Sequence, residues 1–125
     1  MNYPLISVIT VSYNAVLTIE QTILSVINQT YLNIEYIIID GGSTDGTVNV
    51  IKKYADKIAY WVSESDKGIY DAMNKGIAYS HGEYCNFINA GDKFCSSSIL
   101  KQVMNITNRF ISLVGSMPAF RIVKA

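Results

Sequence analysis

The chain has 125 residues, of which 50% are hydrophobic and 16% are charged. That length fits a single domain, and that composition favours a buried core over disorder. Ten basic residues balance ten acidic ones, so the net charge argues against nucleic acid as a partner. The two cysteines, Cys85 and Cys95, are too few for a disulfide framework and lack the paired spacing of a zinc site.

The first half of the chain alternates strand-like and helix-like segments. Residues 6–11 and 34–39 are β-branched runs, each stopped by turn-forming residues, and they predict two buried strands. Between them, apolar residues recur at positions 19, 23, 26 and 27, the spacing of one helical face. We expect Asn14 to be the N-cap of this helix.

The alternation continues in the second half. A helix is predicted from about residue 44 to 54, a short strand over 58–62, a strand over 84–88 and a helix over 96–107. Between the last two strands, one apolar stripe predicts a further helix. This stripe consists of Ile69, Ala72, Met73, Gly76 and Ile77. The fold class is therefore α/β, with a mostly parallel sheet covered by helices on both faces.

Polar segments follow each of the four predicted strands. They are residues 12–14, 40–45, 63–67 and 89–93. In parallel α/β sheets, ligands bind beyond the carboxyl ends of the strands, so these segments are expected to meet at one site. Taken singly, each has an ordinary structural explanation as a turn, a helix cap or a solvated loop.

Three acidic residues and one lysine in these segments suit particular ligands. Asp40, at the mouth of the sheet, could accept hydrogen bonds from a base or a ribose. Asp66 and Lys67 precede a helix, whose N-terminus favours phosphate. Asp92 suits a divalent cation such as magnesium or manganese, which binds carboxylates together with substrate phosphates. His81 precedes a glycine at a predicted helix end, and we assign it a structural role.

Five ordered blocks between residues 5 and 95 resemble the family 2 inverting glycosyltransferases of GT-A fold. The blocks contain Val11-Ser12-Tyr13-Asn14, Asn28-Gln29-Thr30-Tyr31, Asp40-Gly41-Gly42-Ser43-Thr44-Asp45-Gly46, Gly68-Ile69-Tyr70-Asp71-Ala72-Met73-Asn74-Lys75-Gly76 and Phe87-Ile88-Asn89-Ala90-Gly91-Asp92. The resemblance implies a Rossmann-like, nucleotide-sugar-binding domain that is incomplete at its C-terminus. It also implies a nucleoside-diphosphate sugar as donor and a hydroxyl of a glycan or glycolipid as acceptor, with surface polysaccharide assembly as the family-level expectation.

The resemblance assigns roles to the residues of the nucleotide site. Val11 would contribute backbone contacts, and Tyr13 would place its ring against the base. Asp40 would hold the base or ribose, although many members have Asp-Asp where this chain has Asp40-Gly41. Asp66 and Lys67 match positions near the nucleotide and its diphosphate.

The last block occupies the place of the family's DXD metal motif. Gly91 stands where many members have a first aspartate, so the resemblance makes Asp92 the lone carboxylate ligand of a divalent cation. We expect weaker metal binding than at a site with two carboxylates.

The end of the chain differs from the rest in charge. Residues 1–92 hold all ten acidic residues and five lysines, whereas residues 93–125 hold five basic residues and no acidic one. An inverting transferase needs a base near the acceptor, and after Asp92 there is no Asp, Glu or His. We therefore expect a fragment, with a nucleotide-sugar-binding domain over 1–107 and a basic, apolar tail over 108–125 that lacks the general base.

Location and rival functions follow from the same features. No signal-peptide pattern opens the chain, which predicts a cytoplasmic protein. The apolar segment 110–123 is too short to span a bilayer, but it could make a peripheral contact with the inner face of a membrane. The main alternative function is a non-catalytic nucleotide-sugar-binding remnant or regulator. A nucleotidyltransferase is disfavoured because no glycine- and basic-rich phosphate loop follows the first strand, and a purely structural domain would not explain polar groups gathered at one sheet edge.

Overall fold

The computed structural model describes residues 3–114, and side chains as far as residue 106. Its four strands form one parallel sheet in the order β3-β2-β1-β4. The strands are β1 (Ile6–Ser12), β2 (Ile34–Asp40), β3 (Tyr60–Ser63) and β4 (Tyr84–Phe87). The predicted α/β class and parallel sheet are confirmed, and each strand lies within two residues of its predicted bounds.

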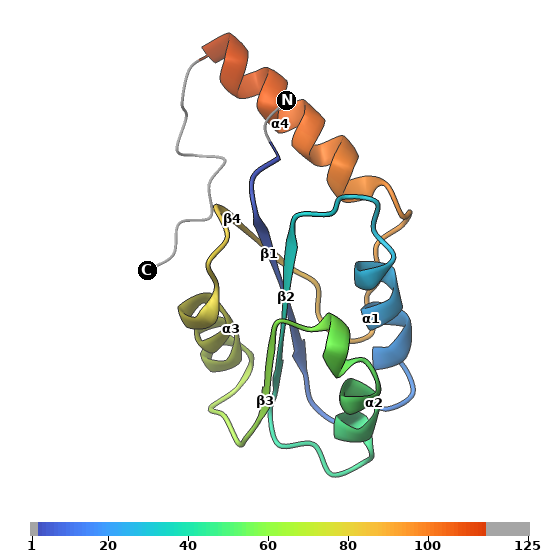
Figure 1. Ribbon diagram of the computed structural model, residues 1–125. Coiled ribbons are helices and arrows are strands. Elements are labelled where there is room, and N and C mark those ends of the chain that lie inside the picture. The colour runs from blue at the N-terminus through green and yellow to red at the C-terminus, as the bar shows by residue number, and fades with distance from the viewer. Residues whose placement is uncertain (1–2, 115–125) are drawn as a thin grey trace.

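Helices cover both faces of the sheet, as the sequence predicts (Figure 1). They are α1 (Ile19–Ile27), α2 (Thr47–Lys53), α3 (Ile69–Tyr79) and α4 (Ile99–Val114), with a short 3-10 turn, η1, at Ala55–Lys57. Figure 1 shows α1 and α2 on one side of the sheet and α3 on the other, while α4 lies near the amino end of β1. The carboxyl ends of the strands lie at the opposite end of the sheet from α4.

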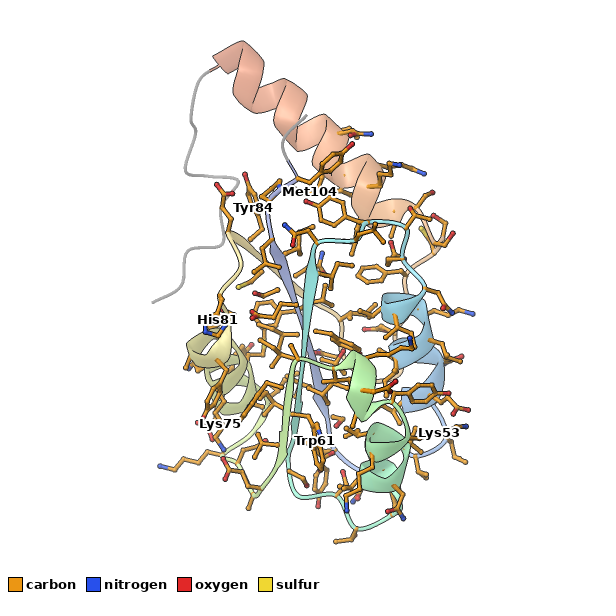
Figure 2. The ribbon with its side chains drawn as sticks, in the orientation of Figure 1. Lys53, Trp61, Lys75, His81, Tyr84 and Met104 are labelled. Carbon is orange, nitrogen blue, oxygen red and sulfur yellow. The ribbon has the colours of Figure 1, made fainter. Side chains whose placement is uncertain are left out.

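Two apolar clusters hold these layers together, one on each face. The strand β2 shows why both are possible, because its side chains alternate between faces: Tyr36 and Ile38 enter one cluster, and Ile37 and Ile39 enter the other. The larger cluster includes residues of α1, α2 and α4, and the smaller one includes Ala72 of α3. Figure 2 shows Met104 of α4 and Tyr84 of β4, both members of the larger cluster, near one end of the sheet.

The expected cap of α1 is wrong. Asn14 has a left-handed backbone with a φ of 46°, and the helix begins five residues later, at Ile19, because a turn over 15–18 intervenes. Asn14 instead ties two loops together, since its N–H donates to Ser43 Oγ at 2.8 Å and its side-chain oxygen accepts the N–H of Thr44 at 2.9 Å. The β1–α1 and β2–α2 loops are thereby fixed to each other at the carboxyl edge of the sheet.

Two further expectations about helices are corrected. The last helix begins at Ile99 rather than Ser96, and it continues to Val114, so the expected domain division after residue 107 falls within α4. The apolar stripe of α3 does not begin in the core, because Ile69 is 46% exposed and faces a cavity described below. No helix in the described part of the chain is long and apolar enough to cross a membrane. The side chains of the expected tail, 108–125, lie outside the described residues, as does the proposed membrane contact of 110–123.

The contact between α3 and β1 permits a first prediction. Gly76 packs so tightly that a Cβ there would lie 2.5 Å from Cγ2 of Ile9, a residue wholly buried in the central strand. Gly76→Ala should therefore overpack the core and lower the free energy of unfolding by roughly 1–3 kcal/mol. Chemical denaturation measures this, with the exposed Asn74→Ala on the same helix as the control; an unchanged stability in Gly76→Ala would contradict this packing.

Candidate functional site

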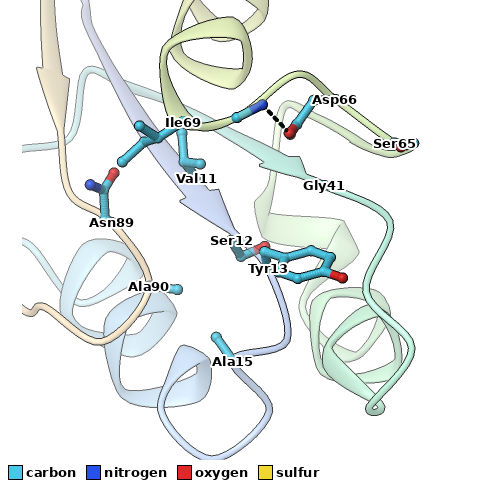
Figure 3. A pocket seen from close by; sticks show the side chains of 11 residues that line it. Val11, Ser12, Tyr13, Ala15, Gly41, Ser65, Asp66, Ile69, Asn89 and Ala90 are labelled. Atoms are coloured by element: carbon cyan, nitrogen blue, oxygen red, sulfur yellow. Dashed lines mark hydrogen bonds between the residues drawn. The ribbon is translucent and has the colours of Figure 1, made fainter.

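A cavity of about 560 Å³ opens at the carboxyl edge of the sheet, a volume typical of small-molecule sites. All four strand-end segments contribute to it, as the sequence predicts. Its lining comprises Val11, Ser12, Tyr13, Ala15, Gly41, Ser65, Asp66, Gly68, Ile69, Asn89 and Ala90. Figure 3 shows Asn89 and Ile69 on one side of this cavity and Tyr13 with Gly41 on the other.

Three of the six residues predicted for the site lie on the cavity wall. Tyr13 is 64% exposed, so its ring is accessible for stacking. Val11 lines the wall beside it, and its carbonyl oxygen accepts the N–H of Ala90 at 3.0 Å. Asp66, from the loop between β3 and α3, also lines the cavity, and it lies beside Tyr13, since a Cβ at Gly41 would contact both side chains. Asp40, Lys67 and Asp92 are not among the lining residues.

Asp40 was expected to present an accessible carboxylate, and this expectation is wrong. The residue is 0% exposed, and its two oxygens accept hydrogen bonds from donors on three segments of the chain. These bonds come from Ser12 Oγ at 2.7 Å, Ser43 Oγ at 2.7 Å, Ser43 N at 2.8 Å, Gly42 N at 3.2 Å and Ser63 Oγ at 2.8 Å. Asp40 therefore binds the ends of β1, β2 and β3 together beneath the cavity instead of facing into it.

The same contacts keep Asp40 ionised. Burial by itself raises the pKa of its carboxyl, but the hydroxyl and N–H donors of Ser43, with those of Ser12 and Ser63, outweigh burial and hold the pKa below its usual value. The carboxylate is thus a fixed negative anchor for the loops that form the cavity. The role of the serines was not predictable from the sequence, because Ser12 and Ser63 lie in other segments and only Ser43 shares a block with Asp40.

Lys67 is exposed and is not among the residues that line the cavity. Its N–H donates to Asp71 Oδ2 at 2.9 Å, while the N–H of Gly68 donates to Asp66 Oδ1 at 3.0 Å. Two N–H groups just ahead of α3 are therefore already engaged by carboxylates of the chain. The helix N-terminus is less available to a phosphate than the sequence alone suggests.

Asp92 lies on the turn after β4, two residues beyond the lining residue Ala90. Thr22 of α1 fixes this turn, since its Oγ1 accepts the N–H of Gly91 at 3.1 Å and donates to the carbonyl oxygen of Asp92 at 2.5 Å. Gly91 has a φ of +103°, a backbone conformation that an aspartate side chain would strain. The backbone conformation of this turn therefore favours glycine at position 91.

The donors available near this turn fit a hard divalent cation that also binds phosphate. Asp92 offers an exposed carboxylate, and Oδ1 of Asn89 is a buried side-chain oxygen with no hydrogen-bond partner among the described residues. Both are oxygen ligands of the kind that magnesium and manganese prefer. Within residues 3–106, no group of three or more His, Cys, Asp or Glu side chains could hold a metal by itself, so phosphate and water would have to complete the coordination. The sequence places Asn89 in the block matched to the metal motif but assigns it no role, and its unpartnered oxygen now indicates one.

The family model described as Glycosyl transferase family 2 matches residues 7–123. The chain belongs to this family. An uncharacterized glycosyltransferase of Mycobacterium tuberculosis is 41% identical over 102 residues, which cover 81% of this chain and 39% of that protein. The chain thus spans about two fifths of that relative's length.

Solved glycosyltransferases share the fold at lower sequence identity. The mannosyltransferase PcManGT from Pyrobaculum calidifontis, solved with GDP-Man and Mn²⁺, is 24% identical with a TM-score of 0.76, covering 82% of this chain and 32% of that one. S. aureus TarS 1-349, solved with UDP, is also 24% identical with a TM-score of 0.76, covering 84% of this chain and 32% of that one. The expected GT-A-like architecture of this glycosyltransferase is therefore confirmed, as is the shortness of the chain relative to its structural neighbours.

Proposed function

We propose that this glycosyltransferase chain forms the part of the enzyme that binds the nucleoside-diphosphate sugar. The observation that carries the proposal is the cavity at the sheet edge, where an exposed aromatic ring, a half-buried carboxylate and an orphaned amide oxygen meet. Its size suits a nucleotide sugar better than a macromolecule. The GDP-Man and UDP in the two structural neighbours support the same ligand class.

Each part of the cavity has a proposed task in transfer. Tyr13 stacks on the nucleobase, Val11 contributes backbone contacts, and Asp66 lies on the same side as Tyr13. Asn89 and Asp92 would hold a divalent cation on the diphosphate, and such a cation neutralises charge on the leaving nucleoside diphosphate. Asp40 takes no direct part, and it keeps the three loops in register. Lys67 is exposed and lies between the lining residues Asp66 and Gly68, so its long side chain would have to bend toward the cavity to contact a phosphate.

We assign the acceptor-binding region and the general base to a part of the enzyme outside residues 1–125. We propose transfer to a hydroxyl of a glycan or glycolipid with inversion at the sugar carbon, which requires a general base. After Asp92 the chain has no Asp, Glu or His, so these residues would bind the donor without supplying the base. This feature also favours the second candidate, a non-catalytic nucleotide-sugar-binding module that keeps the cavity and transfers nothing.

Calorimetric titration with UDP and GDP, each with and without manganese, tests the proposed ligand. Tyr13→Ala should weaken nucleotide binding by roughly 5- to 150-fold, because stacking on an aromatic ring contributes about 1–3 kcal/mol per base. Tyr70→Ala is the matched control, since Tyr70 is 80% exposed and does not line the cavity. Absence of nucleotide binding by the unmodified chain, or equal effects of the two substitutions, would contradict the proposed site. Transfer assays then separate the two candidates, and measurable transfer by residues 1–125 would refute the assignment of the base elsewhere.

A further inference from the structure

Gly41 and Asp66 form a matched pair on the wall of the cavity. Gly41 directly follows β2, and a Cβ at this position would lie 2.9 Å from Oδ2 of Asp66 and 3.4 Å from Cδ1 of Tyr13. The backbone of Gly41 does not have the positive φ that would demand glycine. Glycine is therefore needed here for space, and the atom that uses the space is the carboxylate oxygen of Asp66.

The two oxygens of Asp66 are not equivalent. Oδ1 accepts the N–H of Gly68 at 3.0 Å, drawn as the dashed line in Figure 3. Oδ2 receives no hydrogen bond from any residue that the structure describes, although it lies in the gap beside Gly41 and the Tyr13 ring. One oxygen thus fixes the side chain, and the other remains a free acceptor at the edge of the stacking surface.

We propose that Oδ2 of Asp66 recognises the nucleobase by accepting a hydrogen bond from a ring N–H. This inference rests on the proposed function, in which Tyr13 stacks on the base. An ionised carboxylate only accepts hydrogen bonds. Uracil and thymine carry N3–H, and guanine carries N1–H, on the edge that pairs with other bases. Cytosine N3 and adenine N1 bear lone pairs at the equivalent places, and a lone pair facing a carboxylate is repelled.

The substrate class follows from this chemistry. The donor is a uridine, thymidine or guanosine diphosphate sugar, and cytidine and adenosine diphosphates are discriminated against by roughly 10- to 100-fold, the value of a hydrogen bond to a charged group. Gly41 is required for this recognition, because any side chain at that position would displace the Asp66 carboxylate from the gap.

Calorimetry of the whole chain with UDP, GDP, CDP and ADP, in the presence of manganese, tests the specificity. The unmodified chain should bind UDP and GDP roughly 10- to 100-fold more tightly than CDP and ADP. Asp66→Asn, which keeps the shape of the side chain but adds an N–H donor, should abolish that preference. Asp56→Asn removes the same charge from the exposed η1 turn and should leave the preference unchanged.

Relocating the carboxylate gives the sharper experiment. Asp66→Ala alone should lose the preference for ring N–H bases, and Gly41→Asp alone should weaken binding of all four nucleotides because two carboxylates then compete for one gap. The double variant Gly41→Asp/Asp66→Ala should regain the preference, since the new carboxylate enters the same gap from the β2 side. Thermal unfolding of each variant identifies any that fail to fold, and Asp66→Asn then carries the test.

The outcomes separate this inference from the function on which it rests. If the unmodified chain binds none of the four nucleotides, the proposed function fails and this inference fails with it. If all four bind equally, or if Asp66→Asn keeps the preference for UDP and GDP, recognition by Asp66 is refuted while the nucleotide site stands.

Discussion

Replacing Asp40 by alanine should destabilise this glycosyltransferase chain by about 3–5 kcal/mol, a large part of the 5–15 kcal/mol that holds a typical domain folded. The carboxylate is 0% exposed and accepts five hydrogen bonds. Alanine would leave hydroxyl and N–H donors of Ser12, Gly42, Ser43 and Ser63 buried without an acceptor, and each unsatisfied donor is costly. Urea denaturation measures the loss.

The pH dependence of the stability lost in Asp40→Ala tests the same role of the carboxylate. The pKa of Asp40 is depressed in the folded state, so its contribution to stability is present above its unfolded pKa of about 3.9 and is lost as the pH falls through the folded value. The difference in unfolding free energy between the unmodified chain and Asp40→Ala should therefore be constant near neutrality and shrink below about pH 4. Asp56→Ala, at an exposed position, is the control, and a loss of stability no larger than in this control would show that the carboxylate is not the anchor described.

The same reasoning explains why nucleotide binding should fall with stability in Asp40→Ala. The loops that line the cavity are held by Asp40 and by the bonds between Asn14, Ser43 and Thr44. A variant that folds but has lost these bonds would present Tyr13 and Gly41 in many arrangements, and binding requires them in one. Asp40 thus affects nucleotide binding indirectly, by holding Tyr13 and Gly41 in the arrangement that binding requires.

The sequence predicted the fold well because its signal is periodic. The β-branched runs that became β1 and β2 and the apolar spacing within α1 report burial directly. The edge where the ligand binds was also predictable, since parallel strands place their carboxyl ends together. The errors fall at helix starts, such as Ile19 and Ile99, where hydrogen bonds between distant segments decide the boundary.

The individual site residues were harder to predict than the site. Asp40 and Asp66 both follow strands and precede glycines or helices, so their positions in the sequence do not show which of them is buried and which lines the cavity. Only the three-dimensional structure shows that three serines enclose the first, while Gly41 makes room for the second. Asn89 carries no charge, and its importance appears only once its oxygen is seen to be buried without a partner.

Removal of the Asp92 carboxylate should have the largest effect on ligand binding. In Asp92→Ala, the gain in nucleoside-diphosphate affinity that manganese provides should fall by at least roughly 10- to 100-fold, the loss that even outer-sphere partners of a metal cause. Asp92 is the carboxylate on the turn that follows the lining residues Asn89 and Ala90, and no cluster of three or more acidic, histidine or cysteine ligands exists among residues 3–106 to replace it. Binding measured without metal should change little, because Asp92 does not line the cavity.

Comparing variants of Asn89 with Asp92→Ala shows which side-chain oxygens bind the cation. Asn89→Asp supplies a second carboxylate beside Asp92, so it should strengthen manganese-dependent binding if the orphaned Oδ1 faces the metal. Asn89→Leu should weaken that binding but less than Asp92→Ala, because an amide oxygen contributes less charge than a carboxylate. If manganese-dependent binding is unchanged in Asp92→Ala but lost in Asn89→Leu, the cation binds at Asn89 inside the cavity and not at Asp92. If manganese changes nucleotide binding in no variant and not in the unmodified chain, no metal binds at this site.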